Sequence, residues 1–333
     1  MSRKLLSYTA LGLILGNAAI ADVPKVAVDI APVHSLVSRV MEGVGSPKLI
    51  IPAGASPHEY SLRPSEAKSL QDADMVIWMG EDLAPWMENS IEKLAKNAEV
   101  ITLLEASETK LLDFREGALF EEHDHGDHDD HDDHDDHDDH DHDKDHDDHD
   151  DHDDHDDHAG HDHGEHDPHA WLSIENAQTW LNLVAGKLSA ADPENAGVYF
   201  GNAAAARSEI EELSKEVNSI LDPVRGRSFV VFHDAYQYFE TSFDFPASGA
   251  ISLGDATDPS ASRIAEIQGR VREEGINCVL SEPQYNPNLV ETVLEGTDAK
   301  TGVIDPLGVN LEPGSKLYGD LIRNMAKSLA GCL

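Results

Sequence analysis

The chain has 333 residues, 40% of them apolar, and carries a formal charge of −41 from 65 Asp and Glu against 24 Lys and Arg. This length and apolar content suffice for a sizeable core and favour two domains over one. The acidic balance argues against nucleic acid or an anionic membrane as a partner, because either would demand clustered Lys and Arg.

The first residues resemble a secretory signal peptide. Two basic residues precede an apolar stretch over residues 5–15, and Ala19-Ile20-Ala21 forms a cleavage pattern. The alternative is a membrane anchor, but about a dozen apolar residues fall short of the roughly 20 that span a bilayer. We therefore expect residues 1–21 to be removed and the mature protein to be a soluble protein of the bacterial periplasm.

Strands and helices alternate in the next part of the chain. Apolar stretches and turn residues predict strands at 25–30, 47–51 and 74–79, and helices at 31–41 and 65–71. This order indicates βαβ units and a mostly parallel sheet, whose ligand sites lie at the carboxyl ends of the strands. His58 lies in the loop directly after the second of these strands.

Residues 121–167 form a run in which Asp-Asp-His repeats from Asp129 to His158, and which contributes −25 to the net charge. A period of three fits neither a helix face nor a strand, and almost no side chain is apolar, so we expect a disordered surface insertion. Alternating imidazoles and carboxylates favour many weak sites for divalent transition ions. An acidic tract that only aids solubility would need no histidine. The expected weak sites are His123, His125, His128, His131, His134, His137, His140, His142, His146, His149, His152, His155, His158, His161, His163 and His166.

The rest of the chain predicts a helix over 174–190 and then a second, long helix that has Asp192 as its N-cap and ends near Leu221. At about 43 Å this second helix is long enough to join two lobes. A second alternation follows, with strands at 228–232, 276–281 and 301–304 and helices at 235–241, 259–274, 287–295 and 315–329. The expected division is an N-terminal lobe over 22–190, a linking helix over 191–222 and a C-terminal lobe over 223–333.

The chain has two cysteines, Cys278 and Cys332. An oxidising compartment favours one disulfide between them, which would stabilise the fold by roughly 4 kcal/mol in the chain-entropy model. Two buried, unpaired thiols are the alternative.

Four histidines lie outside the run. His58, His169 and His233 end strands or begin short loops, whereas His34 falls inside a predicted helix, where packing explains it. Three neutral imidazoles and one oxygen make the near-tetrahedral set that zinc favours. Asp305, also at a strand end, or a water molecule can supply that oxygen.

Six motifs together resemble the ZnuA-type periplasmic zinc-binding proteins of the cluster A-I solute-binding family. They are GASPHEY (54–60), SLRPS (61–65), DPHAWLS (167–173), FHDAY (232–236), SEPQ (281–284) and DPLG (305–308). The resemblance implies an α/β fold of two Rossmann-like (β/α)4 lobes joined by a long rigid backbone helix, with the metal in the cleft between them. It also implies a monomer that captures zinc for the integral membrane permease of a high-affinity zinc ABC importer.

By this resemblance His58, His169 and His233 are zinc ligands. An imidazole at His233 argues for zinc, because manganese and iron members tend to have a carboxylate there. Pro57 stands where zinc relatives often have an acidic residue. That leaves Asp305 or water as the expected fourth ligand, with Glu59 a weaker alternative because its side chain should point away.

Two other functions compete with zinc capture. A secreted zinc hydrolase would need an open coordination position beside a general base, and the chain has neither a His-Glu-x-x-His nor a Gly-x-Ser-x-Gly pattern. We therefore expect no enzyme. A periplasmic metal buffer that never docks on a permease remains an alternative, because the acidic run would serve either role.

Overall fold

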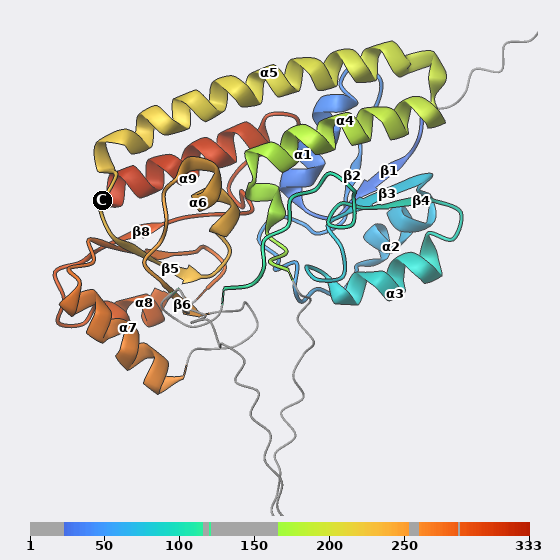
Figure 1. Ribbon diagram of the computed structural model, residues 1–333. Helices are drawn as coiled ribbons and strands as arrows, with labels where there is room; N and C mark the ends of the chain where they lie inside the picture. Colours follow the sequence, from blue (N-terminus) through green and yellow to red (C-terminus); the bar gives the residue numbers. More distant parts are fainter. Residues whose placement is uncertain (1–22, 116–119, 121–165, 253–259, 286) are drawn as a thin grey trace, which may run out of the picture.

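The computed structural model describes residues 23–115, 120, 166–252, 260–285 and 287–333. In this part of the chain, eight strands form two parallel sheets surrounded by helices (Figure 1). The prediction of an α/β fold is therefore confirmed. The expected signal peptide and the acidic run up to residue 165 lie outside the described residues. Among those that are described, no helix is long and apolar enough to cross a membrane.

The first sheet has the parallel strand order β2-β1-β3-β4. The central strands β1 (Val26–Val28) and β3 (Met75–Trp78) are buried throughout, as apolar strands covered on both faces should be. The outer strands are β2 (Lys48–Leu49) and β4 (Glu99–Thr102). The helices of this half are α1 (Ala31–Val40), α2 (Pro64–Gln71) and α3 (Pro85–Leu94).

The second sheet repeats the winding of the first, with the parallel order β6-β5-β7-β8. Its strands are β5 (Phe229–His233), β6 (Ala250–Ser252), β7 (Cys278–Ser281) and β8 (Lys300–Val303). Its helices are α6 (Gln237–Phe243), α7 (Ala261–Glu273) and α8 (Pro287–Leu294). Because the two sheets share one topology, β1 and β5 are equivalent strands.

The sequence pattern does not predict α3, β4 or β6. In β4 only Ile101 is buried, so this edge strand lacks the apolar run of a central strand. In α3 only Met87 and Ile91 are fully buried, which is a weak helical signal. The strand β6 is three residues long. All three elements are short or half-exposed. The place of β4 and β6 in the sheets is decided by pairing with β3 and β5, and that of α3 by packing against α2.

The long helix is divided differently from its prediction. After α4 (Ile174–Ala191), residues Pro193–Asn195 form a 3₁₀ turn, and the α-helix α5 runs over Ala196–Leu221. Asp192 accepts hydrogen bonds from the Asn195 side chain (2.7 Å) and the Tyr199 hydroxyl (2.8 Å). The side chain thus anchors α5 but does not cap it. At 26 residues, α5 is about 39 Å long and passes over both sheets (Figure 1).

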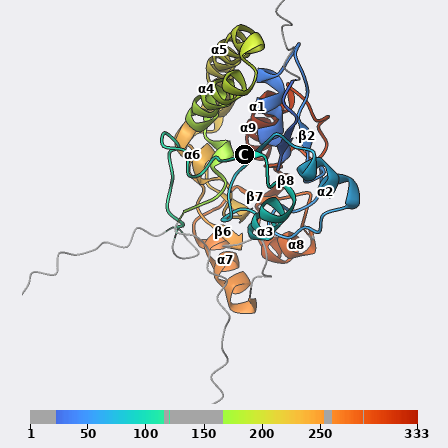
Figure 2. The same ribbon diagram turned by 90° about the vertical axis from the view of Figure 1, so that its right-hand side faces the viewer.

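Helices from both ends of the chain pack against α5. The C-terminal helix α9 (Leu317–Cys332) contacts α1 and α5, and α4 lies beside α5 (Figure 2). The backbone N–H of Tyr318 donates to Ser35 Oγ of α1 at 2.9 Å, and Arg323 binds both oxygens of Glu216 on α5. One continuous apolar cluster contains residues of both halves. The lobe boundaries at 190 and 222 stay a prediction.

A disulfide joins Cys278 of β7 to Cys332 of α9. The predicted pairing is therefore confirmed. The bond ties the central part of the second sheet to the last turn of the helix that packs on α1 and α5. It thereby fixes β7, whose carboxyl end leads directly to Glu282.

Asp29 follows β1 and is fully buried. Its Oδ1 accepts the backbone N–H of Ile30 and its Oδ2 that of Met79, both at 2.7 Å. These bonds tie the carboxyl ends of β1 and β3 together. Burial raises the pKa of Asp29 from 3.8 to about 7, despite the opposing effect of the backbone donors.

We predict that Asp29 makes the fold less stable as the pH rises. A raised pKa favours folding fully below about pH 4, and this contribution is lost as the pH rises through about 7. Between pH 5 and pH 8 the free energy of unfolding of the wild type should fall by about 3 kcal/mol relative to that of Asp29→Asn. Urea denaturation at both pH values measures this. Asp74→Asn is the control, since Asp74 is exposed and also accepts a backbone N–H, from Lys25. A difference independent of pH would contradict the prediction.

Candidate metal centre

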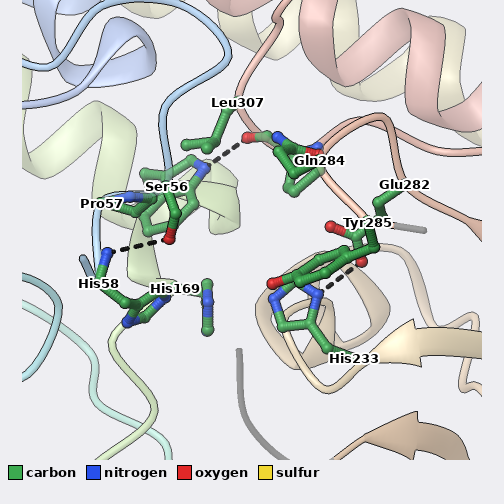
Figure 3. A pocket seen from close by; sticks show the side chains of 11 residues that line it. Ser56, Pro57, His58, His169, His233, Glu282, Gln284, Tyr285 and Leu307 are labelled. Carbon is green, nitrogen blue, oxygen red and sulfur yellow. Dashed lines mark hydrogen bonds and ion pairs between the residues drawn. The ribbon is translucent and has the colours of Figure 1, made fainter. Parts of the chain in front are cut away.

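Three of the predicted ligand histidines converge on one small cavity between the two halves (Figure 3). His58 lies in the loop after β2, and His233 is the last residue of β5. His169 directly precedes a 3₁₀ turn at Ala170–Leu172. The ring centroids of His58 and His169 are 5.6 Å apart, and those of His169 and His233 are 5.3 Å apart. Imidazoles bound tetrahedrally to one zinc at about 2.1 Å would have centroids about 5 Å apart.

His169 is oriented by the residue two positions before it. Its Nδ1 lies 2.7 Å from Oδ1 of Asp167, and the same oxygen accepts the backbone N–H of His169 at 2.9 Å. Both side chains are buried. A carboxylate only accepts hydrogen bonds, so Nδ1 carries the proton and Nε2 is the nitrogen that can bind a metal.

His233 has an equivalent partner from the second sheet. Its Nδ1 lies 2.6 Å from Oε1 of Glu282, which follows β7 and is only 4% exposed. Tyr236 is buried against the same carboxylate, and burial, followed by the Glu282 charge, raises the pKa of its hydroxyl. Glu282 was not predicted as a site residue, although it lies in the SEPQ motif at the end of a predicted strand.

His58 is held in place by its loop. Its backbone N–H donates to Ser56 Oγ at 3.3 Å, and Trp86 Nε1 of α3 donates to the carbonyl of Pro57 at 2.8 Å. Gly54 begins the loop with φ of +84°, a conformation that glycine adopts without strain. The position of His58 therefore depends on α3, an element that the sequence pattern missed.

The cavity has a volume of about 20 Å³, which is room for one water molecule or one ion. Apolar and aromatic walls enclose it, among them Trp171, Tyr285 and Leu307. Trp171 Nε1 donates to the carbonyl of Pro306 at 2.9 Å and so closes one side across the two halves. Among the described residues, no three His, Cys, Asp or Glu side chains stand as a ready-made metal-binding group.

The structure brings neither predicted carboxylate ligand to this cavity. Both oxygens of Asp305 accept backbone N–H groups of its own turn, from Leu307 (3.0 Å), Gly308 (2.9 Å) and Val309 (2.7 Å). Its side chain lines a separate hollow beside α9. Glu59 is exposed and does not line the cavity either. The position of Asp305 after a strand predicts that its carboxylate lies near the site. It does not reveal that backbone N–H groups of the following turn already bind that carboxylate.

Two other histidines are described. His34 is buried in α1, where its Nε2 lies 3.3 Å from the carbonyl of Pro47 and its Nδ1 3.4 Å from Ser38 Oγ, so packing explains it as expected. His166 closes the acidic run, and its Nδ1 lies 2.9 Å from Oδ1 of Asp113. The remaining run histidines lie outside the described residues.

Comparisons with known proteins point to one family. The family model described as "Zinc-uptake complex component A periplasmic" (ZnuA) matches residues 26–332. A protein of Paracoccus denitrificans named "High-affinity zinc uptake system protein ZnuA" is 47% identical over 331 residues, which cover 98% of each chain. One of the same name from Brucella abortus is 46% identical and covers 96% of this chain and 94% of its own.

Among solved structures, one described as "Crystal structure of ZnuA" has a TM-score of 0.70 at 19% identity. It covers 93% of this chain and 99% of the other chain, which shows that the two share a fold. Together with the family model and the two relatives, this leads to one conclusion. The chain belongs to the ZnuA family of periplasmic zinc-uptake components.

Proposed function

We propose that the protein captures zinc in the periplasm and delivers it to the integral membrane permease of an ABC-type zinc importer. One observation carries the proposal. Two buried imidazoles, each with Nδ1 hydrogen-bonded to a buried carboxylate, meet a third imidazole around a cavity that has room for one ion. The curated relatives in Paracoccus and Brucella are named as zinc uptake proteins, which supports zinc as the cargo.

In this proposal His58, His169 and His233 bind zinc, and a water molecule is the fourth ligand. Three imidazole nitrogens favour zinc over manganese or magnesium, which prefer oxygen. The ring centroids, 5.3 and 5.6 Å apart, are slightly wider than the spacing of about 5 Å in a tetrahedral zinc site, so the rings move slightly closer as the ion enters. The carboxylates of Asp167 and Glu282 orient the two rings and fix the tautomer that offers Nε2 to the metal.

We infer transport and no catalysis. The family is described as a zinc-uptake component. A zinc hydrolase needs a general base beside an open coordination position. Glu282 lines the cavity, but its carboxylate is bonded to Nδ1 of His233.

We further propose that residues 1–21 are cleaved on secretion, that the protein is a monomer, and that the acidic run collects zinc at weak sites.

We predict two classes of zinc site. His169→Ala should weaken the tight site by more than about 100-fold, because removing a ligand costs more than the 10- to 100-fold typical of outer-shell partners. Deletion of residues 121–165 should remove only the weak sites, and His131→Ala should change neither class, since neighbouring run histidines substitute for it. Isothermal titration calorimetry against a competing chelator measures both classes. Loss of the tight site on deletion would contradict the assignment.

Glu282 should matter for affinity although it is not a ligand. Glu282→Ala should weaken zinc binding by about 10- to 100-fold, because His233 loses the acceptor that fixes its ring and tautomer. Glu282→Gln keeps an acceptor and should lose less. Glu274→Ala is the control, since Glu274 pairs with Arg270 on the surface of α7. Equal affinities for Glu282→Ala and the control would refute this role.

Delivery is tested apart from capture. In proteoliposomes that contain the permease and ATPase of the zinc importer, the zinc-loaded wild type should stimulate ATP-dependent zinc uptake, and His169→Ala should not. A metal buffer that never docks would bind zinc equally tightly but would leave the uptake rate at the level of free zinc. That result would show that the protein stores zinc and does not deliver it to the permease.

A further inference from the structure

A buried cluster of three charged side chains lies directly behind His233. Arg115, which belongs to the segment between β4 and the acidic run, donates from Nε to Asp234 Oδ2 at 3.0 Å and from Nη2 to Asp234 Oδ1. Its Nη1 donates to Glu240 Oε2 at 2.7 Å and its Nη2 to Glu240 Oε1 at 3.1 Å. The two carboxylate side chains are each 5% exposed, and that of Arg115 is 16% exposed.

The cluster connects the two halves of the molecule at the turn that carries His233. Asp234 directly follows His233. Glu240 lies in α6, which begins three residues after Asp234. Arg115 comes from the other half, on a segment that crosses from β4 toward β5 and α6 (Figure 1). One guanidinium therefore holds both the turn after β5 and the helix that follows it.

The same segment also reaches His169. The backbone N–H of Leu112 donates to the Tyr238 hydroxyl at 2.9 Å, and that hydroxyl donates to the carbonyl of Asp167 at 2.9 Å. The N–H of Asp167 donates to the carbonyl of Leu112 at 2.8 Å. Asp167 in turn accepts from His169. The segment over residues 112–115 thus bonds to the neighbours of both buried histidines, one from each side of the cavity.

These contacts require an arginine. Two buried carboxylates without a partner would be strongly unfavourable, and they would repel each other beside the site. A planar guanidinium can bind both with paired N–H groups, whereas an ammonium is a point charge that satisfies fewer oxygens. The Phe120 ring lies 3.5 Å from Cζ of Arg115 and covers the guanidinium from one side.

We propose that Arg115 is a positioning residue of the zinc site, which locks the His233 turn of one half to the His169 segment of the other. The inference rests on the proposed zinc function and adds a residue that touches no ligand atom. It explains why the Arg115 side chain, in the segment before the acidic run, is buried against α6.

The test uses the full-length protein with three variants: Arg115→Gln, Arg115→Lys and the control Arg323→Gln. Arg323 also binds two carboxylates, Glu216 and Asp320, but it lies on α9 away from the cavity. Zinc affinity is measured by chelator competition, stability by urea denaturation, and ligand geometry by the d–d absorption spectrum of the Co²⁺-loaded protein.

Arg115→Gln should weaken zinc binding by about tenfold or more and change the Co²⁺ spectrum, and Arg115→Lys should recover only part of the affinity. Arg323→Gln should leave both at the wild-type values, whatever it does to stability. An unchanged affinity and spectrum in Arg115→Gln would overturn the inference and leave the zinc site standing. Equal changes in Arg323→Gln would show that lost stability is the cause and would also overturn it. Wild-type protein that binds no zinc tightly would overturn the proposed function as well.

Discussion

A buried imidazole can give a metal only one of its two nitrogens, and the group bonded to the other nitrogen decides which. Asp167 and Glu282 make that decision for His169 and His233. Much of the structure serves to bury these two carboxylates beside their histidines. The winding of the second sheet brings the end of β7 next to the end of β5, and in the first half the crossing segment at Leu112 holds Asp167.

The distance between the halves is set by helices and not by the cavity. The helices α1, α4, α5 and α9 pack together over both sheets, and one apolar cluster runs through them. A continuous core of this kind resists large hinge opening, because opening would expose apolar surface at about 25 cal/mol per Å². Adjustment to an ion is then left to small parts such as the His58 loop and the side-chain rings.

The sequence predicts that three histidines meet at one site, that strands and helices alternate in a parallel α/β order, and that the two cysteines pair. Each of these features has a local or compositional signal. The sequence does not predict α3 and β4, since pairing and packing with distant residues decide them. It places Asp305 correctly at a strand end, but the three backbone N–H groups that bind its carboxylate come from a turn geometry that no spacing reveals. Glu282 and Arg115 were missed because their partners lie 49 and 119 residues away.

The smallness of the cavity has a consequence for how ions are discriminated. A volume of about 20 Å³ cannot admit an ion that keeps its inner shell of water. An entering ion must therefore lose most of its inner water shell, and its bonds to the imidazoles must offset that cost. Mg²⁺ gives up water reluctantly and prefers oxygen donors. No side chain of the site would therefore have to select against it. In the proposed site, dehydration of abundant hard ions would cost more than three imidazoles return, even though these ions are small enough to fit.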